Sequence, residues 1–467
     1  MIARDKGTRP DLTAFMDELR GHVRGRVATD AATRDAHGRG EGLHETMAPD
    51  AVVFGEDSDD IATTIKFCAK AGVPVIPFGA GTSLEGQVQA LRGGVCLDLS
   101  AMDRVLEVSV DDLDCRVEAG LTREALNAHL RDMGVFFPLD PGANATLGGM
   151  AATRASGTNA VRYGTMRDIV LGLTVVTPSG EIIRTGGRTR KSSAGYDLTR
   201  LYIGSEGTLG VITELQLKLF GIPEQISAGL CQFISLEDAV NAVIVILQMG
   251  IDVARVELLD DRQMRACIAY SRLAPLQPIP TLFLEFHGSP AIVADTTTHV
   301  RGILKANGGG ALQLAHTEED RNKLWKARHD AYWAARAIAP GFDGIATDAC
   351  VPISKLAHCI REAKAEASAS GLPHALVGHV GDGNFHMLIL FDPKSADGRG
   401  RAEALALNIA RRSIRHGGTC TGEHGIGLGK LEMLYEEHGE SIEVMRQIKL
   451  ALDPNNLMNP GKTIPLP

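Results

Sequence analysis

Short apolar runs alternate with amphipathic helical segments from about residue 50 onward. The run "AVVFG" at 51–55 is followed by "SDDIATTIKFCAKAG" at 58–72 and then by "VPVIPFGAGTS" at 73–83. Ser58 or Asp59 is a suitable N-cap for the middle segment, and Gly72 is a suitable C-terminal stop. The pattern therefore predicts a strand–helix–strand unit near the start of the chain.

The pattern changes twice in the next hundred residues. Residues 93–120 alternate like successive strands, and "TREALNAHLRDMG" at 122–134 reads as a capped amphipathic helix. Residues 138–165 contain many small residues and no regular hydrophobic period, which is more loop than a compact domain keeps without a use. A hairpin with Pro-Ser-Gly at its turn is predicted for 168–186.

A boundary is predicted at "GIPE", residues 221–224, because the alternation differs beyond it. Helices are expected at 235–250 and 318–338, and strands at 254–260 and 280–288. The tail is Gly-rich and then helical. We expect four parts: a helical lead at 1–45, domains at 46–222 and 223–415, and a C-terminal segment at 416–467.

Composition narrows the class of protein. The chain has 467 residues, 44% of them hydrophobic and 22% charged, which fits two or three globular domains. The net charge of −9 argues against nucleic acid as a partner. The eight cysteines form no CxxC pair, and the start shows no secretory signal. These features predict a cytoplasmic protein, with peripheral association at a membrane left open.

The first chemical candidate is "GHVGDGNFHMLIL" at 378–390, where two short apolar runs flank turn residues. A type I′ turn at Asp382-Gly383 would place His379 opposite His386, with Cβ atoms about 4.5–5.5 Å apart. The two imidazoles would then be within reach of one cation. From this stretch alone, a metal site and a pair of histidines hydrogen-bonded at a sheet edge are equally favoured.

A second candidate is "PFGAGTSLEGQ" at 77–87, directly after a predicted strand. Its glycines allow a tight loop with inward-pointing N–H groups, which can hold a pyrophosphate. The glycine spacing is not that of the nicotinamide-binding fingerprint, and no helix follows. A Gly-rich turn alone is more often just a turn, but two further stretches of small residues, at 141–164 and 204–213, occur in the same region.

Together these three stretches resemble the FAD-binding domain of the vanillyl-alcohol oxidase and p-cresol methylhydroxylase (PCMH) superfamily. The resemblance covers most of the chain, and the C-terminal motifs narrow it to the branch of D-lactate, glycolate and D-2-hydroxyglutarate dehydrogenases. It implies an α+β fold with a two-subdomain PCMH-type FAD-binding domain, a cap domain with an antiparallel sheet, and a C-terminal helical segment that returns to the flavin.

The resemblance also implies which residues contact FAD. The loops at 77–87 and 138–165 contain no histidine or cysteine that could tether the flavin, so non-covalent FAD is expected. The expected contacts are Pro77, Gly79, Ala80, Gly81, Thr82, Ser83, Gly86, Gln87, Pro141, Thr146, Gly149, Ser156, Gly157, Gly164, Glu206, Gly210, Ile212 and Asn459.

The motif "GEHGIG" at 422–427 supplies an acid and a histidine among glycines. Read alone, this would be a solvated loop pair. With the resemblance, His379, His386 and Glu423 are expected to hold a divalent metal, zinc or manganese, since two histidines and a carboxylate with an open position form a catalytic metal arrangement. A cation on the substrate hydroxyl lowers its pKa, and His424 is expected to accept the proton while flavin N5 takes the hydride.

Substrate contacts are expected from Arg328 and Asn384. Arg328 lies in "KLWKARHDAYWAARA" and matches the family's arginine for the substrate carboxylate, although an arginine on such a helix is ordinarily solvent-facing. Asn384 would bond the substrate or simply serve the turn. Relatives that oxidise a diacid carry a threonine four residues after the arginine and a lysine before the next strand, whereas this chain has Tyr332 and the pair Ala346-Thr347 there.

We therefore expect an FAD- and metal-dependent D-2-hydroxy acid dehydrogenase that acts on D-lactate. Oxidation of D-2-hydroxyglutarate or glycolate is the nearest alternative, and a non-redox group exchange of the ether-lipid type is an alternative of another class. A metallohydrolase with structural Gly-rich loops is a third. The electron acceptor would be a quinone, a cytochrome or an electron-transfer flavoprotein. A homodimer is compatible with the sequence.

Overall fold

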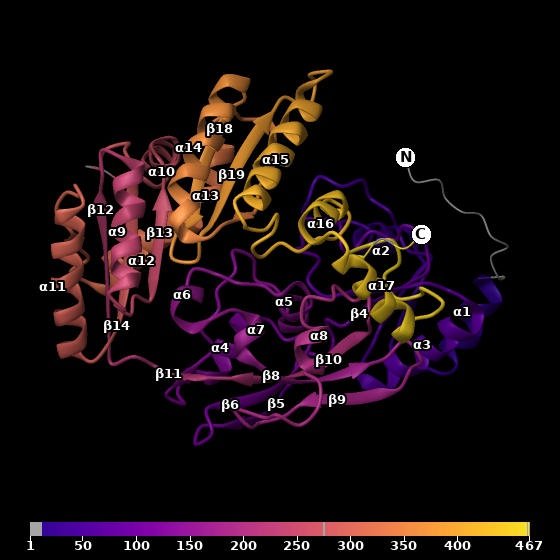
Figure 1. The fold of residues 1–467 in the computed structure, drawn as a ribbon. Helices are drawn as coiled ribbons and strands as arrows, with labels where there is room; N and C mark the ends of the chain where they lie inside the picture. Colours follow the sequence, from indigo (N-terminus) through magenta and orange to yellow (C-terminus); the bar gives the residue numbers. More distant parts are fainter. Residues whose placement is uncertain (1–11, 274–275, 465, 467) are drawn as a thin grey trace. The chain divides into compact units, whose positions relative to one another are not determined.

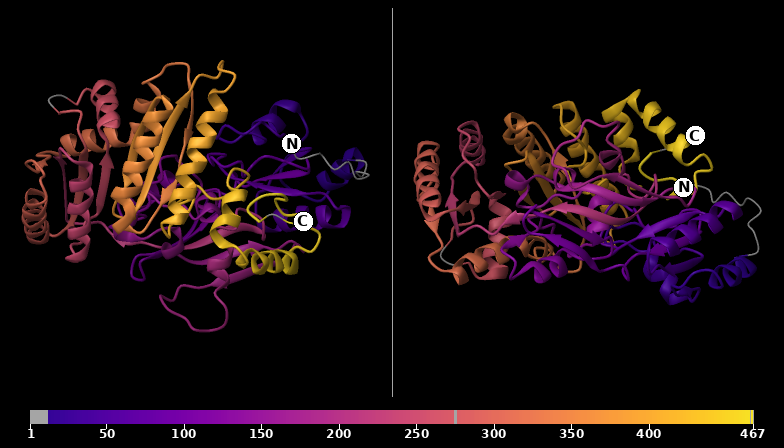
Figure 2. Two further views of the ribbon diagram at one scale, coloured as in Figure 1. Left: turned by 45° about the horizontal axis from the view of Figure 1, so that its top comes forward. Right: turned by 90° about the horizontal axis from the view of Figure 1, so that it is seen from below.

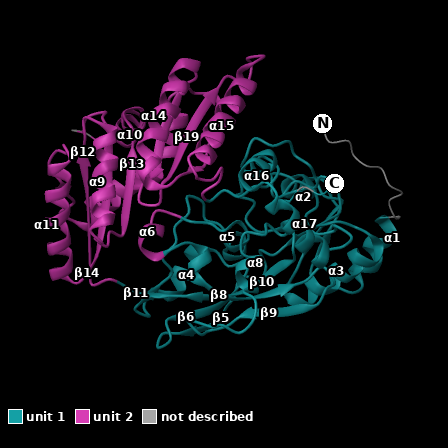
Figure 3. Cartoon of the chain, in the orientation of Figure 1, with its two compact units in different colours: residues 1–156, 164–222, 423–467 teal, residues 157–163, 223–422 magenta. Residues whose placement is uncertain are grey.

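The computed structural model describes residues 12–273, 276–464 and 466. These residues form two compact units, which Figure 3 draws in different colours. Unit 1 holds the chain up to Ser156, then Gly164–Ile222, and the residues from Glu423 onward. Unit 2 holds Gly157–Tyr163 and Pro223–Gly422. Helices and strands occur in both units, and the α+β fold class is confirmed.

The first sheet of unit 1 has the strand order β1-β2-β4-β3, with β2, β4 and β3 parallel (Figure 1). Helix α3 connects β2 to β3, which confirms the predicted strand–helix–strand unit. Gly72 ends α3 with φ 67°, a conformation that glycine adopts at little cost. The N-cap is Asp57 and not Ser58 or Asp59, because its carboxylate accepts the N–H groups of Asp59 and Asp60.

The second sheet of unit 1 is antiparallel, in the order β5-β6-β10-β8-β9. The predicted hairpin at 168–186 is confirmed as β8 and β9. Part of the predicted loop at 138–165 is helical, because Thr146 caps α5 by accepting the N–H of Gly149. Apolar side chains from both sheets and from the helices beside them form one core.

The bounds of the unit 1 elements are, for the helices, α1 (Leu12–Arg20), α2 (Ala31–His37), α3 (Ser58–Ala71), α4 (Arg123–Leu130), α5 (Leu147–Thr153), α7 (Met166–Ile169), α8 (Leu198–Tyr202), α16 (Leu431–His438) and α17 (Ser441–Leu452). The strands are β1 (Val27–Ala28), β2 (Ala51–Phe54), β3 (Val75–Phe78), β4 (Val95–Asp98), β5 (Val105–Ser109), β6 (Asp114–Glu118), β7 (Val135–Phe136), β8 (Val170–Val176), β9 (Ile182–Gly186), β10 (Val211–Lys218) and β11 (Phe220–Gly221).

Unit 2 is built on one large sheet in the order β15-β12-β14-β13-β18-β19-β16, with β17 also paired to β19. Helices α9, α11, α14 and α15 pack beside one another along this sheet, and α10, α12 and α13 form a second group (Figures 1 and 2). The helix predicted over 318–338 is divided at Asp330, which ends α12 and begins α13.

The helices of unit 2 are α6 (Ala160–Tyr163), α9 (Leu236–Gln248), α10 (Asp261–Ser271), α11 (Pro290–Ala306), α12 (Glu318–His329), α13 (Ala331–Arg336), α14 (Ile353–Ser370) and α15 (Gly398–Arg415). The strands are β12 (Gln225–Gln232), β13 (Arg255–Leu259), β14 (Thr281–Gly288), β15 (Gln313–Leu314), β16 (Asp343–Ala346), β17 (Ala349–Cys350), β18 (His374–His379) and β19 (Asn384–Phe391).

The β18–β19 hairpin exists, but its predicted register was wrong. His379 pairs with Asn384 and Val377 pairs with His386, so the connection has four residues, 380–383, and is not a two-residue turn. Pairing of β17 with Asn384 and Phe385 favours this longer connection. The error is two residues, and side chains two apart in a strand share a face, so both histidines still project from the same side.

Candidate functional site

The two histidines of the β18–β19 hairpin have their rings close together in unit 2. The ring centroids lie 5.3 Å apart at an interplanar angle of 83°. His379 Nδ1 lies 2.8 Å from Glu257 Oε1, and His386 Nδ1 lies 2.9 Å from the carbonyl oxygen of Thr347. A carboxylate and a carbonyl only accept, so both Nδ1 atoms carry the proton. Metal coordination would therefore use Nε2 of each ring.

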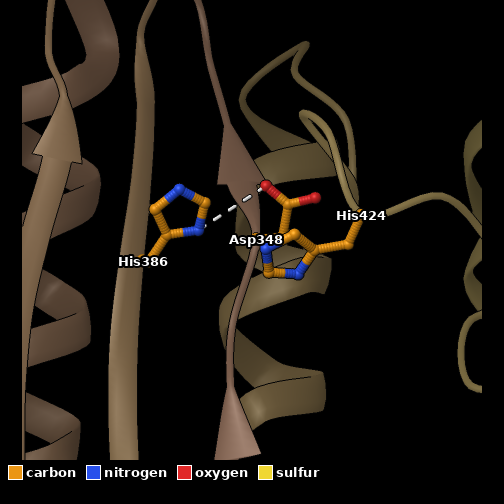
Figure 4. A group of neighbouring side chains, drawn as sticks. All are labelled: Asp348, His386 and His424. Carbon is orange, nitrogen blue, oxygen red and sulfur yellow. Dashed lines mark ion pairs between the residues drawn. The ribbon is translucent and has the colours of Figure 1, made fainter. Parts of the chain in front are cut away.

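A buried carboxylate, Asp348, accompanies this pair. Asp348 is 2% exposed, and its Oδ1 lies 3.7 Å from His386 Nδ1. Figure 4 marks this pair with a dashed line. Its carboxylate accepts hydrogen bonds from Asn384 Nδ2 at 3.0 Å and from Thr421 Oγ1 at 2.7 Å. Asp348 was not predicted as a site residue.

Asn384 opens strand β19 and does not serve as a turn residue. Its Nδ2 donates to Asp348 and to the carbonyl oxygen of Ala349. Its Oδ1 is buried and has no hydrogen-bond partner among the described residues. A buried acceptor without a partner costs free energy, so this oxygen suits a donor supplied by a ligand, such as a hydroxyl group.

Arg328 is buried, contrary to the usual position of an arginine on a polar helix. Only 9% of the residue is exposed, because α12 packs it onto the sheet of unit 2. Both Nε, at 2.9 Å, and Nη2, at 2.6 Å, donate to Oε2 of Glu257. Glu257 itself is 1% exposed and was not predicted as a site residue. A charged residue inside the apolar strand "ARVELLD" is the signal that could have identified it.

Unit 2 also has a second group of possible metal ligands, His358, Glu362 and His416, near α14 and α15. These side chains are partly exposed, at 43%, 43% and 27% respectively. Arg412 already pairs with Glu362, with a 3.1 Å distance from Nε to Oε2. The buried pair on β18 and β19 is therefore the better candidate for a functional metal, and His358 offers a matched control.

The predicted phosphate loop of unit 1 has the donors that an anion requires. The backbone N–H groups of residues 79–83 donate to no acceptor within the described part of the chain. A Cβ on Gly79 would meet Thr146 Oγ1 at 2.3 Å, and a Cβ on Gly207 would meet Pro77 at 2.8 Å. The three predicted stretches thus contact one another in unit 1, and their unused backbone donors fit the diphosphate of FAD.

The C-terminal residues join the same loops. Asn459 Nδ2 donates to the carbonyl oxygens of Gln87, at 3.1 Å, and Glu206, at 2.8 Å. Lys462 Nζ donates to the Gln87 carbonyl at 2.7 Å, and burial lowers the pKa of Lys462 to about 7. Within unit 1, Asn459 and Lys462 of the C-terminal segment therefore contact the loops at 77–87 and 204–213.

His424 lies in unit 1 beside a second buried acid. Its Nδ1 is 3.7 Å from Glu85 Oε1, and its carbonyl oxygen accepts from Gln87 Nε2 at 2.9 Å. Lys430 Nζ lies 3.0 Å from the same Glu85 oxygen. Burial acts to raise the pKa of Glu85, but Lys430 and His424 outweigh it and hold that pKa below its ordinary value. Glu85 is therefore ionised at neutral pH.

The remaining predicted contacts divide between the units. Gly157 belongs to unit 2 and directly follows Ser156 of unit 1 in the chain. Glu206 accepts the N–H groups of Ile426 and Gly427, and burial raises its pKa. Unit 1 also contains the other predicted contacts Ala80, Gly81, Thr82, Ser83, Gly86, Pro141, Gly149, Gly164, Gly210 and Ile212.

The described residues include no helix that is both long and apolar enough to cross a bilayer. All eight cysteines lie within the described ranges, and none of them forms a disulfide. Seven of the thiols are buried.

Comparison with known proteins agrees with this arrangement. Residues 49–186 match the FAD binding domain model, and residues 222–463 match the model of the C-terminal domain of FAD linked oxidases. The probable mitochondrial D-lactate dehydrogenase of Danio rerio is 49% identical over 94% of this chain and 89% of its own length. The mitochondrial D-lactate dehydrogenase [cytochrome] of Arabidopsis thaliana is 45% identical, over 97% and 80%.

More distant relatives and solved structures extend the comparison. A glycolate oxidase subunit of Bacillus subtilis is 34% identical over 89% of this chain and 88% of its own length. p-Cresol methylhydroxylase shares the fold, with a TM-score of 0.81 at 16% identity over 98% of both chains. The chain belongs to the FAD-linked oxidases, in the branch that holds D-lactate dehydrogenases and a glycolate oxidase subunit.

Proposed function

We propose that this protein oxidises a D-2-hydroxy acid, D-lactate above all, using non-covalent FAD and a divalent metal. The relatives named as D-lactate dehydrogenases align with most of the chain, which supports the substrate class. One observation carries the proposal: two histidines with anchored Nδ1 atoms lie on the sheet against which helix α12 packs a buried arginine. A metal could bind the substrate hydroxyl, and a guanidinium could bind its carboxylate.

The metal would be held by His379, His386 and Glu423. A Cβ on Gly422 would meet Asn384 Nδ2 at 2.2 Å and Asp348 Oδ1 at 3.1 Å, so the backbone at 422 lies against the histidine network. Glu423 is the next residue, and consecutive Cα atoms are about 3.8 Å apart. Covalent geometry thus supports Glu423 as the third ligand. A bound divalent cation would polarise the substrate hydroxyl and lower its pKa.

Arg328 would bind the substrate carboxylate. Its Nε and Nη2 are held by Glu257, so the guanidinium plane is oriented before substrate arrives. Asn384 Oδ1, which lacks a partner among the described residues, would accept the hydrogen bond of the substrate hydroxyl until that proton passes to His424. These contacts would hold the hydroxyl-bearing carbon in one orientation, which lowers the entropic cost of reaction.

His424 would accept the hydroxyl proton. The ionised carboxylate of Glu85, 3.7 Å from Nδ1, would stabilise the imidazolium that forms. Gln87 holds the backbone of His424 through a 2.9 Å hydrogen bond, which restricts where the ring can lie. FAD, cradled by the loops at 77–87, 138–165 and 204–213, would supply the acceptor for the hydride.

A small monoacid suits the residues around Arg328. Tyr332 stands four residues after the arginine and is 44% exposed, and Ala346 ends strand β16. Thr347 spends its hydroxyl oxygen on the N–H of Met387. None of these three side chains offers a cation for a second carboxylate, so a five-carbon diacid would bind poorly.

The electron acceptor is proposed to be a cytochrome, because three relatives carry "cytochrome" in their names. A cytoplasmic location and a homodimer remain predictions of the sequence. The absence of disulfides among the eight described cysteines is compatible with a reducing compartment.

A dye-reduction assay against 2-hydroxy acids of both hands tests the proposal. D-Lactate should reduce the dye fastest, L-lactate should not, and acid or heat should release FAD from the purified protein. Chelation should abolish turnover and leave FAD bound. His386→Ala should lose the metal, whereas His358→Ala should retain it. Dye reduction that is indifferent to chelation would overturn the metal, and absence of any reduction by 2-hydroxy acids would overturn the reaction class.

A further inference from the structure

Glu257 occupies an unusual position for a carboxylate, inside the large sheet of unit 2. Strand β13 pairs with β18 through Leu258 with Gly378 and Leu259 with Val377. The next position in this antiparallel register places Glu257 opposite His379. On the other side of the carboxylate, α12 delivers Arg328. The sheet register and one helix thus place three chemically different groups in contact.

The two carboxylate oxygens serve different partners. Oε2 accepts from Nε and Nη2 of Arg328, and Oε1 accepts from Nδ1 of His379 at 2.8 Å. All three groups are buried, at 1%, 9% and 8% exposure for Glu257, Arg328 and His379. A carboxylate shared in this way holds both partners, because moving either one breaks a charge-assisted hydrogen bond where water cannot replace it.

We infer that Glu257 is a positioning residue that sets the separation between the carboxylate-binding guanidinium and the metal-binding imidazole. This rests on the proposed function. A 2-hydroxy acid carries its carboxylate and its hydroxyl on adjacent carbons, so the groups that bind them must be held at one short distance. Glu257 fixes the tautomer of His379, which presents Nε2 for coordination, and the orientation of Arg328 in the same step.

The competing explanation is a purely structural ion pair. Glu285, on the neighbouring strand β14, provides the comparison within the same sheet. It is 4% exposed, lies 2.8 Å from His287 Nε2, and pairs with Arg255 at 3.6 Å. None of these three residues belongs to the proposed site. Loss of Glu285 therefore reports what loss of a buried glutamate does to the fold alone.

The test compares Glu257→Gln with Glu285→Gln in the FAD-loaded protein. Glutamine keeps the size but has only one acceptor oxygen. Its NH2 group must therefore face an N–H donor of either Arg328 or His379, and one hydrogen bond is lost. After chelation, titration with Mn²⁺ alone should give a Kd raised by about 10- to 100-fold for Glu257→Gln, the usual scale for an outer ligand partner. At saturating Mn²⁺ the KM for D-lactate should remain raised by about tenfold, because Arg328 has lost its anchor.

Glu285→Gln should change neither the Mn²⁺ Kd nor the KM by more than about twofold. If Glu257→Gln matches wild type in both quantities, or if Glu285→Gln matches Glu257→Gln, the inference is overturned. Where Glu257→Gln fails to fold with FAD bound, Glu257→Asp replaces it, since it keeps the charge. A Kd raised at least about threefold over that of Glu285→Gln then supports the inference, and a smaller change overturns it.

Failure of the proposed function would look different. If His386→Ala binds Mn²⁺ as tightly as wild type, the metal does not lie at the hairpin and the proposed site is wrong. If His386→Ala loses Mn²⁺ while Glu257→Gln behaves as wild type, the site stands and only the positioning role of Glu257 is excluded.

Discussion

Two clusters of the same composition lie at the large sheet of unit 2, one of them completed by an arginine from helix α12. One joins Glu257 to an arginine and a histidine, Arg328 and His379, and the other joins Glu285 to Arg255 and His287. Arg255 and Glu257 are two residues apart in β13, so their side chains share a face of the sheet.

The clusters differ in the groups that surround the histidine. His287 lies 2.7 Å from the hydroxyl of Tyr163 through Nδ1 and 2.8 Å from Glu285 through Nε2, so protein groups occupy both ring nitrogens. In the other cluster the carboxylate holds Nδ1 of His379, and the ring lies beside that of His386. Residue types alone are therefore not enough for the proposed metal site, which also needs a second imidazole beside the first.

The largest difference should come from removing each histidine. His379→Ala should lose the metal and reduce turnover by about 10⁴-fold or more, because polarisation by a metal contributes several kcal/mol. His287→Ala should retain the metal, and its turnover per folded molecule should stay close to that of wild type. Metal content and kcat for D-lactate measure both. A metal-free His287→Ala enzyme would erase the distinction between the clusters.

A histidine that moves a proton should behave differently from one that holds a metal. For His424→Ala we expect FAD and metal content to persist while flavin reduction by D-lactate slows by about 10²- to 10⁴-fold. Stopped-flow absorbance of the flavin measures this rate. Unchanged reduction kinetics would assign the proton to another group.

The two arginines provide a further contrast. Arg328→Lys should raise the KM for D-lactate by about 10- to 100-fold, since lysine cannot hold Glu257 and a carboxylate in one plane. Arg255→Lys should leave the KM within about twofold, because Arg255 stacks on Trp325 at 4.5 Å and pairs with Glu285, and neither of these residues is proposed to bind the substrate. Equal effects on KM would show that Arg328 does not bind the substrate.

Substrate size tests the surroundings of Arg328. The value of kcat/KM for D-lactate should exceed that for D-2-hydroxyglutarate by about 10-fold or more, since a buried carboxylate without a partner costs at least ~1–3 kcal/mol. D-2-hydroxybutyrate should fall between them. A clear preference for the diacid would refute the assignment to a small monoacid.

The smallest expected effect concerns stability, in the Glu285 cluster. Burial acts to raise the pKa of Glu285, but His287 and Arg255 outweigh it, so the folded pKa lies below the ordinary 4.5. A lowered pKa stabilises the fold above pH 4.5 and loses that contribution as pH falls through the folded value. Glu285→Gln should cost about 1–3 kcal/mol at pH 7 and progressively less below pH 4.5, measured by urea unfolding. A cost that is independent of pH would contradict this pairing.

Local pattern was sufficient for much of the fold and for part of the site. Period and capping residues predicted the strand–helix–strand unit with its stop at Gly72 and the hairpin of β8 and β9. The β18–β19 hairpin and the shared face of its histidines also followed from the sequence, because an error of two residues leaves side chains on the same side of a strand.

Tertiary structure decided the rest. The local sequence at Asp382-Gly383 favours a two-residue turn. Pairing of β17 with β19 favours a longer connection, and the sequence of the hairpin does not indicate that a third strand pairs with it. Glu257 lies more than one hundred residues before His379 in sequence, and only the register of β13 with β18 brings them together. The sequence could not say whether Arg328 is buried or exposed on its helix. An arginine is buried only where a carboxylate pairs with it, and Glu257, which does so here, is distant in the sequence.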